Sequence, residues 1–265
     1  MNRQLTVLML VILTFSLSAY GQKWKLTRYE VHFGIGTTNV FGDIGGTADA
    51  NNLFGLKDIR IKETGLSIYA AGRYKLTANQ AIKVNLIYGF ANGSDVNSKN
   101  DVTRGFSYRT SFFEPSVQYE YYFIGDYTQN RNIKTLYNRD GMINDYKTIT
   151  AYGFLGVGGL FFSPKLSFNG NDPSPSMNSF SDYSKMSIVI PIGLGVKYVI
   201  DRYWSVGFEL GRRFTFTDYL DGLSSKYSNS NDTYYFGVFH AIYKLETDRY
   251  GTPLLFKRNK YRGPR

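Results

Sequence analysis

The sequence predicts an all-β fold, a closed antiparallel transmembrane β-barrel of eight strands. Three observations favour it. Apolar residues alternate with small or polar residues in eight segments, which is the period of a β-strand. The 265 residues include 27 Gly, 20 Phe and 23 Tyr, a composition typical of barrels that cross a membrane. Long connections alternate with short ones, as expected when loops gather at one end and turns at the other.

Composition also excludes several classes of protein. The chain has no Cys, which rules out a disulfide scaffold, a thiol nucleophile and a lipid anchor on Cys. Two His leave little material for a metal site. A hydrophobic fraction of 43% is too high for a disordered chain. We expect no enzymatic activity and no catalytic, cofactor-binding or metal site.

The N-terminus has the three regions of a secretory signal peptide. Arg3 supplies a positive charge, an apolar run covers 5–17, and small residues follow before Gln22. The run is shorter than the ~20 residues that a membrane helix needs. We therefore expect residues 1–21 to be cleaved, residues 22–245 to form the barrel and residues 246–265 to form a basic tail.

The first four predicted strands each place apolar side chains on one face. The segment 29–36 does so at its odd-numbered positions, and 66–74 does so at its even-numbered positions. The segment 82–90 places its apolar side chains at even-numbered positions, with Lys83 on the opposite face. The segment 113–123 places them at odd-numbered positions, with acidic and polar residues on the opposite face. Each reads as a half-apolar strand.

The last four predicted strands complete the set. The segment 149–162 is apolar on both faces, so its phase is ambiguous. The segments 188–200 and 204–211 alternate clearly and are separated by only three residues, which predicts a hairpin. In 233–245 we expect an outward set consisting of Tyr235, Phe239, Ala241 and Tyr243.

The connections predict which end faces outward from the cell. Four are long and rich in Gly, Asn, Asp and Ser, namely 39–63, 91–105, 163–184 and 218–232. The connections 77–80 and 201–203 are short. We expect the long loops to be extracellular and both termini to be periplasmic, in the outer membrane. The long connection 125–148 breaks the rule, and a further hairpin within 127–146 would raise the strand count to ten.

The non-lipid faces of the predicted strands share a balanced set of charges, four acidic and four basic. An eight-stranded barrel is just wide enough for side chains to fill. We expect this lumen charge network to plug the barrel and prevent it from acting as a general pore. Its members are Glu30, Arg73, Lys83, Glu114, Glu120, Lys197, Glu209 and Arg213.

One charge falls on the lipid face. Arg212 shares that face with Trp204 and Leu210. An Arg there costs roughly 2–4 kcal/mol at the midplane but only about 0–1 kcal/mol at an interface. We expect it at the outer interface, where lipid phosphates are within reach.

Other candidate sites have simpler interpretations. His32 and His240 are expected to face each other inside the lumen, where hydrogen-bonded interior histidines are favoured over a catalytic or pH-sensing pair. Asp218, Asp221 and Gly222 do not match a calcium loop, so a turn with solvated carboxylates is expected. Gly-rich 153–159 lacks the Lys and helix of a phosphate loop, which favours close packing in the barrel wall.

The C-terminal tail concentrates positive charge. Its cations are Lys257, Arg258, Lys260, Arg262 and Arg265, with no acidic residue among the last nine. A solvated end and a binding segment are both open interpretations. In the periplasm its counterparts would be acidic protein surfaces or lipid phosphates, and nucleic acid is not expected.

Three blocks of sequence resemble the PorG-type outer-membrane barrels of Bacteroidetes. They are residues 204–221, residues 29–36 with 41–46, and residues 231–237. The most specific block is 211–221, with the motif residues Thr217, Asp218, Tyr219 and Asp221. The resemblance implies a component of the type IX secretion system that associates with a periplasmic ring containing a lipoprotein. It carries no catalytic residues.

The sequence thus supports two functions that make opposite demands on the two ends of the barrel. The first is a non-enzymatic barrel that anchors or organises a secretion machinery through its periplasmic segments 125–148 and 246–265. The second is an adhesion or small-ligand-binding barrel that acts through its long outer loops. No small-molecule substrate is expected under the first, and outer-membrane lipid surrounds the barrel under both.

Overall fold

The computed structural model describes residues 28–42, 44, 63–77, 79–95, 105–124, 137–138, 141–142, 149–168, 184–201, 203–223, 231–245, 247 and 253. The predicted signal peptide 1–21 and the five cations of the tail lie outside these residues. The described part of the chain holds no helix long and apolar enough to cross a bilayer.

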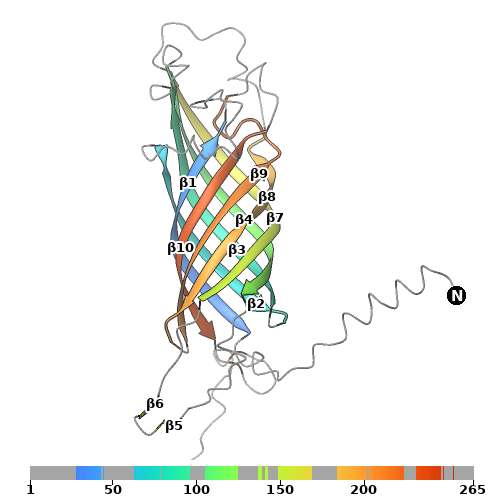
Figure 1. Ribbon diagram of the computed structural model, residues 1–265. Helices are drawn as coiled ribbons and strands as arrows, with labels where there is room; N and C mark the ends of the chain where they lie inside the picture. Colours follow the sequence, from blue (N-terminus) through green and yellow to red (C-terminus); the bar gives the residue numbers. More distant parts are fainter. Residues whose placement is uncertain are drawn as a thin grey trace, which may run out of the picture.

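Eight antiparallel strands close into a barrel (Figure 1). In chain order they are β1 (Tyr29–Phe41), β2 (Gly65–Lys75), β3 (Gln80–Ser94), β4 (Phe106–Ile124), β7 (Ile149–Phe168), β8 (Met186–Val199), β9 (Trp204–Thr215) and β10 (Thr233–Leu245). Sequence neighbours pair around the wall, and β1 closes it against β10. The predicted fold class is confirmed.

The connection between β4 and β7 adds no strand to the barrel. It contains a separate two-stranded piece, β5 (Tyr137–Asn138) and β6 (Gly141–Met142). This piece lies beyond the end of the barrel at which β1 begins (Figure 1). The described barrel therefore has eight strands, and the hairpin left open by the sequence lies outside its wall.

The strand registers fix the tilt of the wall. Pairs of cross-strand partners lead from Tyr29 through Tyr74, Ile82, Tyr119, Leu155, Ile192, Arg212 and Tyr235 back to β1 at Asn39. One circuit therefore moves ten residues along β1, from Tyr29 to Asn39. Stagger, tilt and diameter are linked in a closed barrel, and eight strands leave an interior that side chains fill.

Several strands are longer than the sequence predicted. The strand β4 begins at Phe106 and not at Phe113, and β7 runs on to Phe168. In these extensions inward Tyr108 and Thr110 alternate with outward Arg109 and Ser111. Because the outward side chains there are polar, the apolar alternation used for prediction ends before the strands do. The two connections predicted at 91–105 and 163–184 are therefore shorter, because β3 continues to Ser94 and β7 continues to Phe168.

The outer face of the barrel is apolar over a wide band. Large hydrophobic side chains such as Ile35, Ile68, Leu194 and Phe239 are more than three-fifths exposed. Aromatic pairs mark both edges of the band, with Trp204 and Tyr243 at one edge and Phe113 and Phe161 at the other. Such a band with aromatic girdles is the surface of a barrel that faces lipid.

The last described residues extend the fold beyond β10. Thr247 and Pro253 form an isolated antiparallel bridge, and both are buried. Two residues of segment 246–265, predicted to be a basic tail, are therefore paired with each other and buried.

Candidate functional site

We call the end of the barrel that holds connections 77–80 and 201–203 the turn end and the opposite end the loop end. All eight charged residues predicted to face inward lie in the lumen, and each is at most 2% exposed. They form two groups. The lower charge cluster, near the turn end, contains Glu30, Glu120, Glu209, Arg73, Lys83, Lys197 and one further cation, Lys75. The upper pair is Glu114 with Arg213.

Arg73 is the centre of the lower charge cluster. Its Nη1 donates to Glu30 Oε2 at 2.9 Å, and its Nε lies 2.7 Å from Glu120 Oε2. Its Nη2 lies 3.7 Å from Glu209 Oε1. Strand pairing explains part of this geometry, because Glu30 and Arg73 are direct cross-strand partners. One guanidinium thus joins carboxylates from three strands.

Lysines complete the pairing of these carboxylates. Lys83 Nζ lies 2.9 Å from Glu120 Oε1 and 2.5 Å from Glu209 Oε1. Lys75 Nζ lies 2.8 Å from Glu30 Oε1. Lys197 Nζ approaches the same oxygen at 3.4 Å. Each of the three carboxylates contacts at least two cations, as buried charges require.

Tyrosines and glycines allow the cluster to pack. Tyr152 donates its hydroxyl to Glu209 Oε1 at 2.6 Å and accepts from Arg73 Nη2 at 3.1 Å. Its ring lies against Gly195 on β8, where a Cβ would approach ring carbon Cζ to 2.4 Å. The ring therefore occupies space that only a glycine leaves open. In the Gly-rich segment 153–159, a Cβ on Gly156 would approach the carbonyl oxygen of Val117 to 2.4 Å, which agrees with the close packing predicted there.

The two histidines face each other inside the barrel, as predicted. The rings of His32 and His240 stack with centroids 5.0 Å apart. His32 Nε2 lies 3.8 Å from Glu30 Oε2, and His240 Nε2 lies 3.9 Å from Glu209 Oε1. Each ring thus lies beside a carboxylate, at a distance longer than a direct hydrogen bond. Both are too deeply buried for a substrate to reach.

The upper pair closes the lumen at a second level. Arg213 Nε lies 3.8 Å from Glu114 Oε2, which also accepts a hydrogen bond from the hydroxyl of Tyr234. The guanidinium lies over the ring of Phe236 at 4.5 Å and donates to the carbonyl of Phe236 at 3.2 Å. This pair is surrounded mainly by aromatic and aliphatic side chains.

The chain after β9 folds into the loop end of the barrel as a cap, which we define as residues 216–223. Leu220 and Leu223 are fully buried, and Leu220 joins a cluster with Phe112 and Phe162. Thr110 Oγ1 donates to the carbonyl of Leu220 at 2.6 Å. Burying two leucines stabilises the cap by about 3–6 kcal/mol before the entropy of ordering is counted.

Two carboxylates fix the cap. Asp221 accepts from the backbone N–H of Ile44 at 3.0 Å and of Leu223 at 2.9 Å. Asp232 Oδ2 accepts from the backbone N–H of Leu220 at 2.8 Å. The prediction of solvated carboxylates is therefore wrong for Asp221, which is fully buried.

The other motif residues shape the same turn. Thr217 Oγ1 accepts from the backbone N–H of Tyr219 at 3.2 Å. The ring of Tyr219 packs against the apolar cluster, and Asp218 is half-buried. Gly222 adopts a φ of 83°, a left-handed conformation that favours glycine. The motif thus encodes an inward-folded cap.

Sequence reasoning missed several lumen residues. Lys75 and Lys244 are both buried inward, so the balanced charge set was incomplete. Tyr152 was missed because the phase of its strand was ambiguous. A signal for Lys75 existed, since it continues the inward alternation of Ala71 and Arg73 by one step.

Arg212 faces outward, as predicted. Its Nη2 donates to Thr233 Oγ1 at 2.9 Å. Its guanidinium lies over the rings of Phe214 and Tyr235 at 5.1 Å and 5.8 Å. These aromatic contacts partly cover the charge on the lipid-facing side.

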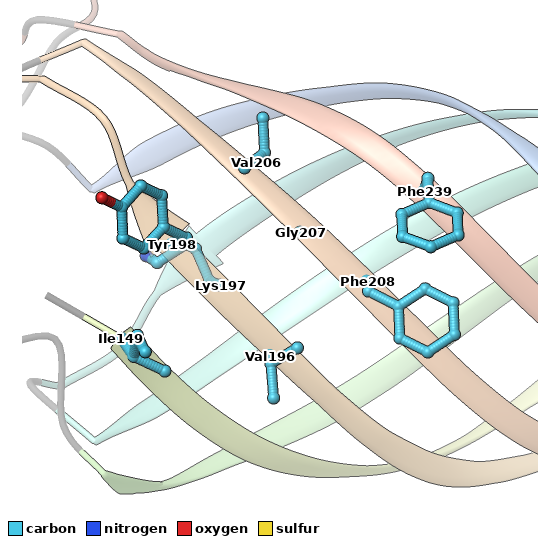
Figure 2. Close-up of a pocket in the computed structure, with 8 residues that line it drawn as sticks. All are labelled: Ile149, Val196, Lys197, Tyr198, Val206, Gly207, Phe208 and Phe239. Atoms are coloured by element: carbon cyan, nitrogen blue, oxygen red, sulfur yellow. The ribbon is translucent and has the colours of Figure 1, made fainter. Parts of the chain in front are cut away.

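A groove of about 240 Å³ opens on the outside of the wall, across β7 to β10. Val196, Tyr198, Val206 and Phe239 line it and are exposed (Figure 2). Lys197 also lines it, but its Nζ contacts Glu30 in the lumen. The groove therefore presents an apolar surface, suited to acyl chains and not to a polar ligand.

The fold and the filled interior define a β-barrel with a lipid-facing outer surface and a lumen occupied by its own side chains. Residues 2–244 match the family described as Domain of unknown function (DUF6089), and the chain belongs to that family. No curated protein matches the sequence.

Solved barrels resemble the chain only distantly. The Ail protein of Yersinia pestis, in complex with the heparin analogue sucrose octasulfate, is 10% identical with a TM-score of 0.40, covering 82% of this chain and 98% of its own. OprG from Pseudomonas aeruginosa is 11% identical with a TM-score of 0.42, covering 83% and 97%. The outer membrane enzyme PagL is 14% identical with a TM-score of 0.31, covering 80% and 97%. Likenesses at this level carry no argument about function.

Proposed function

We propose that the protein is a non-enzymatic outer-membrane barrel that anchors or organises the type IX protein secretion machinery of a Bacteroidetes cell. In this proposal the loop end is extracellular and both termini are periplasmic. Periplasmic segments 125–148 and 246–265 contact ring proteins, including a lipoprotein.

The filled lumen carries the proposal. The lower charge cluster, the upper pair and the cap occupy the interior at three levels, from the turn end to the loop end. A barrel filled in this way offers no path for a substrate protein, so its contribution to secretion would come from the surfaces at its ends. The filled lumen therefore supports a scaffold over a pore.

The turn end offers the segments that such a scaffold needs. Both ends of the barrel chain, at β1 and β10, meet there as cross-strand partners Tyr29 and Leu245. The bridge between Thr247 and Pro253 holds the start of the basic segment close to that end. The five cations that follow, from Lys257 to Arg265, would meet an acidic surface on a partner.

An adhesion or ligand-binding role for the loop end is the alternative. It is favoured by the length of β4 and β7, which carry the wall beyond the apolar band. The two proposals place the partner at opposite ends of the barrel.

A pull-down from detergent-solubilised outer membrane separates them. One variant ends after Pro253, which keeps the bridge with Thr247 and removes the cations. A second keeps the full length but replaces the five tail cations with Gln. A matched control replaces loop residues 96–104 with a Gly-Ser linker and leaves the tail intact.

The scaffold proposal predicts that ring components follow the full chain and the loop control but not either tail variant. Mass spectrometry of the eluates gives the readout. Recovery of the barrel alone from the full chain, or identical partners with and without the tail cations, would contradict it. Loss of partners only in the loop variant would favour the alternative.

A further inference from the structure

Two cations of the same sign face each other on the outside of the barrel. Arg109 on β4 and Lys165 on β7 are direct cross-strand partners, and both side chains are exposed. Cβ atoms of directly opposed residues lie about 5 Å apart, and like charges at that distance destabilise a sheet. An anion bound between the two cations would remove this repulsion.

The protein does not supply that anion from its described residues. No carboxylate among them forms an ion pair with Arg109 or Lys165. The guanidinium of Arg109 lies over the ring of Phe90 at 4.8 Å, which orients it without neutralising it. The two cations thus lie on the paired strands β4 and β7, with their charge directed outward.

Successive outward pairs along β4 and β7 change character in order. Phe113 pairs with Phe161, Ser111 pairs with Ser163, and Arg109 pairs with Lys165. The order toward the loop end is therefore aromatic, hydroxyl and cationic. We call the last two pairs the basic patch.

This order matches the polarity of a bilayer interface. The aromatic pair belongs to the girdle that marks the edge of the apolar band. The cations lie four residues farther along the strand, about 13 Å away, and a tilt near 40° reduces the height difference to about 10 Å. The headgroup layer extends about 5–8 Å beyond the hydrocarbon, so the backbone of the two cations lies just above it and their long side chains can reach its phosphates.

We propose that the basic patch binds a phosphate group on the headgroup of an outer-leaflet lipid. Arg109 donates two hydrogen bonds from its planar guanidinium, and Lys165 adds a second positive charge. Ser111 and Ser163 donate to the neighbouring headgroup oxygens, and Phe113 and Phe161 contact the acyl chains below. The site adds lipid recognition to the proposed scaffold and rests on the orientation that places the loop end outside the cell.

The test uses the purified full chain in detergent micelles and native mass spectrometry of bound lipid. The probes are bis-phosphorylated lipid A, the same lipid A without phosphate, and inorganic phosphate. The double variant Arg109→Gln/Lys165→Gln removes both charges, and Arg109→Lys/Lys165→Arg keeps them. Lys185→Gln is the matched control, because Lys185 is an exposed cation at the loop end of β8.

We expect the double Gln variant to bind phosphorylated lipid A about tenfold more weakly, while the charge-keeping variant and the Lys185→Gln control bind like the parent chain. Removal of the phosphates should weaken binding to the parent chain by a similar factor. Unchanged binding by the double variant, or equal binding of both lipids, would overturn the proposal. Binding of inorganic phosphate as tight as that of lipid A would overturn the assignment to a lipid.

Urea unfolding gives a second readout that does not depend on counting lipid. Without lipid A, the double Gln variant should be at least as stable as the parent chain, because the repulsion is removed. With phosphorylated lipid A, the parent chain should become the more stable of the two. A parent chain whose stability does not respond to lipid A would count against the site. Failure here would leave the pull-down result intact, because that experiment depends on the turn end.

Discussion

The replacement Arg73→Met tests whether the lower charge cluster holds the lumen together. Methionine keeps most of the length of the side chain and removes the guanidinium. Arg73 contacts Glu30 and Glu120 at 2.9 Å and 2.7 Å, and it donates to Tyr152 at 3.1 Å. With its third carboxylate, Glu209, at 3.7 Å, Arg73 joins three acidic residues of the lumen, whereas Lys83 joins two.

The magnitude follows from what remains after the change. Breaking a buried ion pair by removing one partner costs about 3–5 kcal/mol. Glu30 keeps Lys75 and Lys197, and Glu120 keeps Lys83, so no carboxylate loses all its cations. We therefore expect the lower end of the range, a loss of about 3 kcal/mol. Lys75→Met removes a contact with one carboxylate of the cluster, Glu30, and should cost less, about 1 kcal/mol.

Urea unfolding of the barrel in lipid vesicles measures both changes, followed by the heat-dependent gel mobility of folded barrels. With a slope of about 3 kcal/mol per M, the Arg73→Met midpoint should fall by about 1 M. Lys185→Gln is the surface control and should leave it unchanged. A loss below about 1 kcal/mol for Arg73→Met, or equal losses for the two lumen variants, would refute the assignment of Arg73 as the centre of the cluster.

Three further predictions address the cap, the wall and a turn. Asp221→Asn leaves one of two backbone N–H groups without its acceptor. The free energy of unfolding should therefore fall by about 2 kcal/mol in the same urea assay. An unchanged value would argue against an ordered cap. Gly195→Ala places a Cβ 2.4 Å from the Tyr152 ring and should lower the free energy of unfolding by about 1–3 kcal/mol. The outward control Gly72→Ala, whose Cβ has nothing within 4 Å, should lower it far less. Equal effects would contradict the packing of Tyr152 against Gly195. At Asp201, hydrogen bonds from two backbone N–H groups hold the pKa of the carboxyl below its usual value. The stability that this carboxylate adds should be present above about pH 4 and disappear as the pH falls through the lowered pKa. The difference in urea midpoint between the parent chain and Asp201→Asn should therefore disappear in acid. A difference that persists in acid would show that the ionised carboxylate is not its cause.

The strand pattern made the barrel predictable. Segments such as 188–200 alternate strictly because one face contacts lipid and the other the lumen. The same reason explains where the prediction stopped. Above the apolar band outward positions such as Arg109 become polar, so periodicity fades although pairing continues to Phe106.

The charged residues of the lumen were predictable because, at the level of the apolar band, a charge on an alternating strand is far less costly when it faces inward. Lys75 was missed because it lies at the end of its strand, where a cation is equally compatible with water. In β7, glycines occupy both faces, so the sequence does not tell which face holds Tyr152.

The cap could not be predicted from local sequence. Asp221 and Gly222 form a turn in any surface loop. Their burial depends on Ile44 and Thr110, which are distant along the chain and become neighbours only when the barrel closes. Tertiary contacts of this kind leave no periodic signal.

We infer that the lumen is filled and that the barrel acts through its ends. Planar-bilayer recording with the purified mature protein tests this inference. We expect no large, stable conductance steps, because side chains from all levels of the lumen and the cap block an aqueous path. Large and stable steps from correctly folded protein would contradict it.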